Sequence, residues 1–144
     1  MKILFATDGS NFSEAAAQMI AKQFRPQGCE VRVLTVVEPI TTAAMPQMAS
    51  GYYPELEDQK RAAKTLVELA AKILSEAGFK TFPLVLAGDA KTVIIDEAAD
   101  WHADLIVLGS HGRKGLGRFL LGSVSEAVAR HTSCSVEIVR LPSK

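Results

Sequence analysis

Leu105-Ile106-Val107-Leu108-Gly109-Ser110-His111-Gly112 is an apolar run that passes directly into a glycine-rich segment. Nine residues later the chain continues as Gly122-Ser123-Val124-Ser125-Glu126-Ala127-Val128-Ala129, which has the pattern of a helix start. The order is therefore a buried strand, a glycine-rich loop and a helix N-terminus. Such a loop brings unpaired backbone N–H groups together at the positive end of a helix dipole. This arrangement suits an anion, most often a phosphate.

Short apolar runs alternate with helical patterns over the whole chain. Five runs are typical of strands, and they cover residues 2–7, 31–37, 82–87, 104–108 and 136–141. Four segments between them have helical patterns, and they cover residues 11–25, 55–77, 90–101 and 122–131. This alternation indicates a parallel sheet with helices on both faces. We predict one α/β domain over residues 1–144, with an open five-stranded parallel sheet in the order 3-2-1-4-5.

That strand order makes the first and fourth strands neighbours at a topological switch point. Ligands of such folds bind in the crevice at this point, outside the carboxyl ends of the strands. The segment Thr7-Asp8-Gly9-Ser10 leaves the first strand there, and the loop that begins at Gly109 leaves the fourth. We therefore expect both segments to face one crevice.

The composition argues against several classes of partner. Lys plus Arg equals Asp plus Glu at 16 each, so the chain lacks the electrostatic footprint of a general nucleic-acid binder. No apolar run approaches the roughly 20 residues that cross a bilayer, and residues 1–9 lack the apolar region of a signal peptide. Cys29 and Cys134 match neither a Cys-x-x-Cys pair nor a zinc spacing. We predict a cytoplasmic protein with free thiols and neither nucleic acid nor membrane as partner.

The glycine-rich loop matches neither of two widespread phosphate motifs. A Walker A loop requires Gly-Lys-Ser/Thr at its end, whereas the chain has Gly117-Arg118-Phe119 there. A dinucleotide fingerprint requires G-x-G-x-x-G directly after a strand, and Leu120 stands at the third glycine position. A glycine-rich turn that only permits tight packing is the plainer alternative. The number of glycines, the helix start and the switch point favour a ligand site.

The pattern Gly109-x2-Gly112-x9-Gly122-Ser123 resembles the nucleotide-loop signature of the ATP-binding branch of the universal stress protein family. The resemblance extends to Ile3-Leu4-Phe5-Ala6-Thr7-Asp8-Gly9-Ser10 in the first strand, to residues 103–113 around the fourth and to residues 134–140 at the last. Ser135 departs from the family, which usually has proline there. The resemblance implies a Rossmann-like fold of the adenine nucleotide alpha-hydrolase type, with ATP and magnesium as ligands.

The resemblance also implies a site assembled from three strand ends and the start of the last helix. Gly109 and Gly112 would let the backbone approach phosphates that a Cβ would block. The N–H groups and hydroxyls at the start of the last helix would donate to phosphate oxygens. The implied nucleotide-binding residues are Ala6, Thr7, Asp8, Val36, Val37, Leu108, Gly109, Gly112, Arg113, Gly122, Ser123, Val124 and Ser125.

Several of these residues have plainer alternative roles. Asp8 would bind the ribose or adenine side or help to hold magnesium, but it could also cap the turn after the first strand. Ser123 and Ser125 could serve only as helix caps. The resemblance implies that backbone groups and an apolar side chain at Val36 and Val37 meet adenine, but these side chains could instead be ordinary core residues, which is the favoured alternative for them.

Two segments around the crevice leave their roles open. Arg113, together with the nearby cations Lys114 and Arg118, could neutralise a triphosphate or form a solvated basic loop. Residues 38–54 are long for a loop in a compact domain. They could close over the crevice as a lid, or form a surface loop without function.

The residues favour nucleotide binding over turnover, because the chain shows no clear catalytic base, no paired carboxylates and no Walker lysine. We therefore predict a nucleotide-responsive protein in stress response or signalling. One alternative is a slow ATPase or nucleotide hydrolase assisted by His111 or Asp8. Another is a dimeric interaction module that does not depend on a nucleotide.

A homodimer through residues 136–141 is a separate prediction. The last strand lies at a sheet edge, and edges of this kind are usually protected. Its apolar residues Val136, Ile138 and Val139 are expected to be exposed in a monomer. Pairing two copies across a two-fold axis would cover them, and the family resemblance implies the same arrangement.

Overall fold

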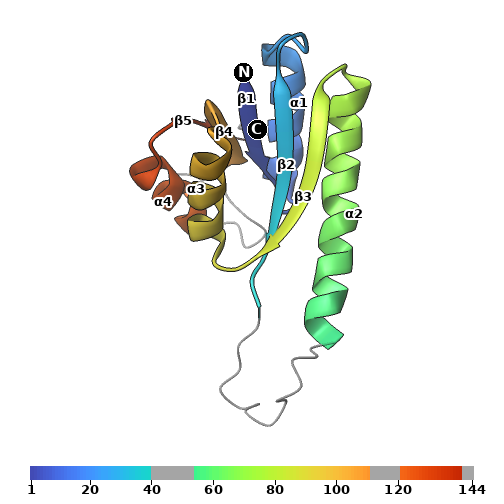
Figure 1. The fold of residues 1–144 in the computed structure, drawn as a ribbon, viewed down its shortest axis with the longest axis vertical. Helices are drawn as coiled ribbons and strands as arrows, with labels where there is room; N and C mark the ends of the chain where they lie inside the picture. Colours follow the sequence, from blue (N-terminus) through green and yellow to red (C-terminus); the bar gives the residue numbers. More distant parts are fainter. Residues whose placement is uncertain (40–53, 111–120, 141–144) are drawn as a thin grey trace.

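The computed structural model describes residues 1–39, 54–110 and 121–140, except for the side chains of residues 11–13 and 54. Strands and helices alternate along these ranges (Figure 1). The strands are β1 (Lys2–Ala6), β2 (Glu30–Val37), β3 (Lys80–Ala87), β4 (Leu105–Gly109) and β5 (Ser135–Val139). The helices are α1 (Asn11–Gln23), α2 (Pro54–Glu76), α3 (Ala90–Trp101) and α4 (Ser123–His131).

The strands form one parallel five-stranded sheet in the order β3-β2-β1-β4-β5, which confirms the predicted order. The central strand β1 pairs with two neighbours, so Phe5 lies opposite Val33 of β2 and opposite Val107 of β4. The sheet therefore grows outward from β1 in both directions. The carboxyl ends of β1 and β4 lie side by side at the switch point, as the predicted topology requires.

The helices form two layers, with α1 and α2 on one face of the sheet and α3 and α4 on the other (Figure 1). Successive residues of a strand point to opposite faces. Ile3 and Phe5 of β1 pack in the core under α1 and α2, whereas Leu4 packs in the core under α3 and α4. All three side chains are fully buried. This two-sided burial explains why the first strand reads as a continuous apolar run.

The edge strand β5 is less exposed than its sequence predicts. Val139 is 5% exposed, and Val136 and Ile138 are half-buried within the single chain. The prediction that all three are exposed in a monomer is therefore wrong, because β5 packs against both helix layers at the end of the sheet. Leu141, the last residue of the predicted strand, lies outside the described residues. The exposed backbone of this edge is the remaining argument for pairing.

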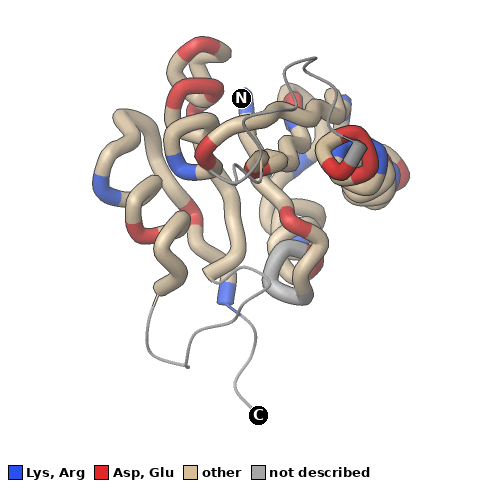
Figure 2. The backbone as a smooth tube through the Cα atoms, turned by 90° about the horizontal axis from the view of Figure 1, so that it is seen from below, with Lys and Arg blue, Asp and Glu red and all other residues tan. Residues whose placement is uncertain are grey.

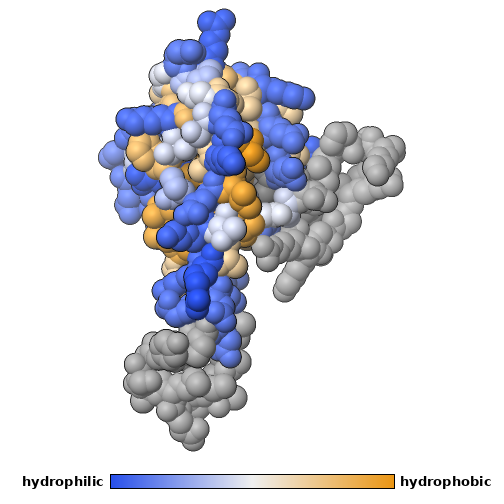
Figure 3. Space-filling model, turned by 90° about the vertical axis from the view of Figure 1, so that its right-hand side faces the viewer, coloured by the Kyte–Doolittle hydropathy of each residue, from blue (hydrophilic) through white to orange (hydrophobic). Residues whose placement is uncertain are grey.

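The surface carries both signs of charge on its helices and strands (Figure 2). A groove of about 510 Å³ lies between α2 and the edge strand β3, and it is lined by Lys60, Lys64, Val67, Glu68 and the 83–87 stretch of β3. Figure 3 shows that hydrophobic and hydrophilic residues lie side by side on this face of the molecule. This groove is two strands away from β1 and is not part of the crevice at the switch point. In the described parts of the chain, no helix is long and apolar enough to cross a bilayer. Cys29 and Cys134 are free thiols, as predicted.

Candidate functional site

The chain leaves β1 through a tight turn at the switch point. The N–H of Thr7 donates to the carbonyl of Leu34 (2.8 Å), so pairing with β2 continues one residue beyond the strand. Gly9 has a φ of 78°, a left-handed conformation that favours glycine. The Asp8 carboxylate accepts a hydrogen bond from the N–H of Ser10 (2.9 Å). Asp8 thus caps the turn, and because a carboxylate has several acceptor positions its predicted ligand role is compatible with this bond.

The glycine-rich loop begins and ends at one place, which we call the loop neck: Gly109, Ser110, Gly122 and Ser125. The N–H of Gly122 donates to the carbonyl of Ser110 (2.7 Å). The hydroxyl of Ser125 donates to the carbonyl of Gly109, also at 2.7 Å. The N–H of Ser110 in turn donates to the carbonyl of Val139 in β5 (2.9 Å). These bonds fix the start of α4 against the end of β4.

Helix α4 starts without a side-chain cap. Gly122 occupies the N-cap position with φ −64° and ψ 155°, and among the described residues no side-chain cap is made there. The first backbone bond of the helix runs from the N–H of Glu126 to the carbonyl of Gly122 (2.9 Å). The N–H groups of Ser123, Val124 and Ser125 precede that bond and have no acceptor within the helix. Such N–H groups, together with the helix dipole, favour an anion at this position.

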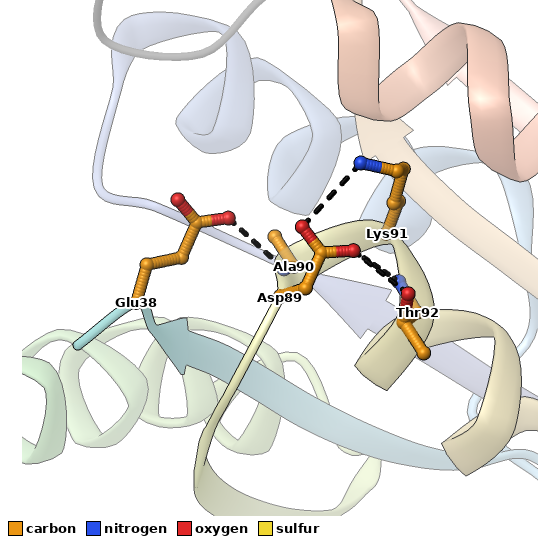
Figure 4. Close-up of polar contacts among 5 residues, drawn as sticks. All are labelled: Glu38, Asp89, Ala90, Lys91 and Thr92. Atoms are coloured by element: carbon orange, nitrogen blue, oxygen red, sulfur yellow. Dashed lines mark hydrogen bonds and ion pairs between the residues drawn. The ribbon is translucent and has the colours of Figure 1, made fainter. Parts of the chain in front are cut away.

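Helix α3 has the opposite arrangement at its N-terminus, although it belongs to the same layer (Figure 4). The Asp89 carboxylate accepts from the Thr92 hydroxyl (2.7 Å) and from the Thr92 N–H (3.4 Å). Glu38, just beyond β2, accepts from the N–H of Ala90 (3.0 Å). Two carboxylates therefore satisfy the first turn of α3 and would repel a phosphate. Of these two helix starts, α4 is the one suited to an anion.

Replacing Asp89 with asparagine is expected to remove a pH-dependent part of the stability. The hydrogen bond from the Thr92 hydroxyl lowers the pKa of Asp89, and Lys91 acts in the same direction. A carboxyl group whose pKa is lowered on folding stabilises the protein above its ordinary pKa, and this stabilisation is lost as the pH falls through the lowered value. Asparagine caps a helix about as well without a charge.

The measurement for this variant is the free energy of unfolding from neutral to acidic pH. The advantage of the wild type over Asp89→Asn should be constant near neutral pH and should begin to shrink below about pH 4, where the carboxyl group becomes protonated in the unfolded chain before it does so in the folded one. A difference that stayed constant down to strongly acidic pH would contradict a stabilising role for the ionised Asp89 side chain.

Four of the five apolar residues of the predicted site lie on one face of the sheet. Ala6, Val36, Leu108 and Val124 all pack in or against the core between the sheet and the layer of α3 and α4. Leu108 is 4% exposed, and Val37, which ends β2, is 6% exposed. Their side chains therefore belong to the core. Any contact of Val37 with a base would therefore involve its backbone atoms, whereas the side chain of Val36 is half-buried.

The structure narrows the predicted role of Ser125. A serine hydroxyl has one hydrogen to donate, and in Ser125 it points to the carbonyl of Gly109. What Ser125 offers to a ligand is thus its backbone N–H, whereas the side chain of Ser123 is exposed. Gly112 and Arg113 lie outside the described residues, as do residues 40–53 of the candidate lid.

Sequence reasoning missed one buried polar residue at the site. Thr35 of β2 is 6% exposed, and its hydroxyl donates to the carbonyl of Thr7 (2.8 Å). A threonine inside the apolar run at residues 31–37 was the available signal, because a buried hydroxyl must find a hydrogen-bond partner. In the described ranges, no group of three or more His, Cys, Asp or Glu side chains could hold a metal ion.

Comparison with known proteins identifies related sequences over nearly the full length of the chain. A sequence model described as "Universal stress protein family" matches residues 1–140. Universal stress protein MJ0531 of Methanocaldococcus jannaschii is 35% identical, over 99% of this chain and 84% of the relative. Universal stress protein YxiE of Bacillus subtilis is 30% identical, over 96% of this chain and 98% of the relative.

Solved structures share the same fold. The structure of protein MJ0577, also from M. jannaschii, matches with a TM-score of 0.84 at 29% identity, over 99% of this chain and 97% of that chain. An Arabidopsis thaliana family member with AMP bound matches with a TM-score of 0.70 at 20% identity, over 99% and 93%. An Archaeoglobus fulgidus member in complex with dAMP has a TM-score of 0.67 at 22% identity, over 96% and 97%.

Proposed function

This chain belongs to the universal stress protein family, and we propose that it binds ATP in the crevice between the ends of β1 and β4. In this proposal the phosphates lie against the N–H groups of Ser123, Val124 and Ser125. The base and ribose lie toward the turn at Thr7 and Asp8 and toward the backbone that ends β2. Nucleotide occupancy then alters the shape or the partners of a cytoplasmic stress-response or signalling protein.

The observation that carries the proposal is the uncapped start of α4. Its N–H groups lack acceptors within the helix, and its N-cap residue, Gly122, has no side chain that could cap it. The loop neck holds this start beside the end of β4, next to the end of β1. Neighbouring strands of a sheet are about 4.8 Å apart, so a ligand at the start of α4 is within reach of the β1 turn. The crevice thus offers backbone donors for phosphate and a carboxylate, Asp8, on its other side.

The related structures support an adenine nucleotide as the ligand class. The Arabidopsis member holds AMP and the A. fulgidus member holds dAMP. A further universal stress protein, with a TM-score of 0.74 at 21% identity over 96% of each chain, is in complex with cAMP. These ligands share adenine and a phosphate, but dAMP lacks the 2′-hydroxyl of the sugar and cAMP has its phosphate in a cyclic ester. Backbone N–H groups that bind the phosphate are compatible with such variation, because they do not contact the sugar hydroxyls.

Magnesium is proposed to enter together with the nucleotide. Mg²⁺ commonly keeps several waters and binds through one or two carboxylates plus substrate phosphates. Asp8, which lies in the turn after β1, is the carboxylate proposed to take part. Magnesium would neutralise the phosphates, while the residues of this chain hold the nucleotide in place.

Equilibrium binding to ATP, ADP and AMP, with and without magnesium, tests the proposal. We expect saturable binding of one nucleotide per chain in the micromolar range, with ATP gaining most from magnesium. No binding of any of the three below millimolar concentration would overturn the proposal. The proposed homodimer through β5 is tested by sedimentation of the same samples, in which a monomer at micromolar concentration would count against pairing.

A further inference from the structure

Two buried hydroxyl groups hold the two halves of the crevice in the same way. Ser125 is 4% exposed, and its hydroxyl donates to the carbonyl of Gly109, the last residue of β4. Thr35 is 6% exposed, and its hydroxyl donates to the carbonyl of Thr7, the first residue after β1. In both pairs the hydroxyl comes from the neighbouring element, and the carbonyl lies where the chain leaves its strand for the site.

The bonded carbonyls stand at the two points where the backbone must turn. Beyond Thr7 the chain enters the turn that carries Asp8, with Gly9 in a left-handed conformation. Beyond Gly109 it continues through the loop neck, where the N–H of Gly122 donates to the carbonyl of Ser110. Without the bond from the hydroxyl, the strand end could fray, and a buried carbonyl left without a donor lowers the stability of the fold. Each hydroxyl therefore fixes the direction in which its strand leaves the sheet.

We propose, on the premise that the crevice binds a nucleotide as argued above, that Ser125 and Thr35 are positioning residues for that nucleotide. Neither hydroxyl is available as a donor to the ligand, because each has one hydrogen and uses it on a backbone carbonyl. Ser125 sets the place and direction of the N–H groups at the start of α4. Thr35 sets the place of the β1 turn. Misplacing either half by a fraction of an ångström weakens contacts that both halves must make at once.

The test uses pairs of variants that differ in the hydroxyl. Thr35→Val removes the hydroxyl at nearly constant volume, and Thr35→Ser keeps it. Ser125→Ala removes the other hydroxyl, and Ser125→Thr keeps it. Thr65→Ala is the matched control, because the Thr65 hydroxyl also donates to a backbone carbonyl, that of Arg61 (3.2 Å), but on the exposed surface of α2.

Dissociation constants for ATP are measured at a temperature where every variant is fully folded. We expect Thr35→Val and Ser125→Ala each to weaken ATP binding about tenfold, because only a fraction of the free chain would then hold the strand end in the position that binds. Thr65→Ala is expected to bind as the wild type does, and Thr35→Ser and Ser125→Thr, which keep the hydroxyl, are expected to retain most of the affinity that the hydroxyl-free variants lose. Amide exchange gives a second readout: the Ser110 and Gly122 N–H groups should exchange faster in Ser125→Ala, and the Thr7 N–H faster in Thr35→Val.

Three outcomes separate the possibilities. Unchanged affinity in Thr35→Val and Ser125→Ala, with only a lower unfolding temperature, would overturn the positioning role and leave the proposed function intact. An equal loss in the hydroxyl-keeping variants would also overturn it, because volume rather than the hydrogen bond would then decide. A wild-type chain that binds none of the nucleotides would overturn the proposed function and, with it, this inference.

Discussion

A Ser123→Asp variant is expected to lose at least about a hundredfold in ATP affinity while remaining as stable as the wild type or becoming more stable. Ser123 is exposed in the first turn of α4, so the new side chain displaces nothing from the core. A negative charge in the first turn of a helix stabilises by about 0.3–1 kcal/mol. The same charge would occupy the position proposed for phosphate. The stability of the fold should therefore stay the same or rise, while the affinity for ATP falls.

The expected size follows from the distance between like charges. Two unit charges 4 Å apart interact by about 4 kcal/mol at an effective dielectric constant near 20, and salt reduces this value. A hundredfold loss corresponds to about 2.7 kcal/mol. The new carboxylate would also accept hydrogen bonds from the N–H groups that the phosphate needs, which adds to the loss.

Ser133→Asp is the matched control for charge. Ser133 is exposed just beyond the carboxyl end of α4, so this variant has the same net charge with the aspartate at the other end of the helix. We expect it to bind ATP as the wild type does. Calorimetric titration of both variants, together with thermal unfolding without nucleotide, gives both quantities. Equal affinities for Ser123→Asp and the wild type would place the phosphate elsewhere.

Phe5→Ala is expected to lower the free energy of unfolding by about 3–5 kcal/mol, the range for a large aromatic residue removed from a core. Phe5 is fully buried in the central strand β1 and lies between β2 and β4. It packs in the core under α1 and α2. Because one residue contributes to both halves of the sheet, surrounding side chains cannot refill the space without moving a strand.

Phe82→Ala is the control for the chemical change. Phe82 lies in the edge strand β3 and is 38% exposed, so its truncation should cost about 1 kcal/mol or less, as is usual for partly exposed positions. Urea unfolding curves of the two variants measure the difference. Similar losses for both would mean that the central strand is not the main site of core packing.

The architecture was predictable because its signals are local and repeated. Apolar runs at 2–7 and 104–108 mark strands buried on both faces, and the alternation with helices leaves few topologies. The strand boundaries were less certain: β3 begins at Lys80, two residues before the predicted start. That residue is exposed at the sheet edge, where no apolar pattern marks pairing with Glu30.

The position of the candidate site was predictable, but its hydrogen bonds were not. Glycine spacing and the switch point indicate where the chain could meet a phosphate. The sequence shows a serine at position 125 without showing that its hydroxyl turns inward to Gly109. Likewise, nothing local connects Glu38 with the N–H of Ala90, far along the chain. Such partners depend on which elements become neighbours in space.

If the chain binds a nucleotide at the start of α4 as proposed, the uncapped start of this helix links nucleotide concentration to local stability. A ligand that binds only the folded helix start stabilises it by RT ln(1 + [L]/Kd), about 2.7 kcal/mol at a hundredfold excess over Kd. The bound phosphate would act as the N-cap that the chain itself does not supply. Helix α4 leads within a few residues into β5, which completes the sheet edge. Changes in the ATP concentration would thus change how often α4 and the adjoining edge strand open. The stability of this one helix would then depend on the ATP concentration.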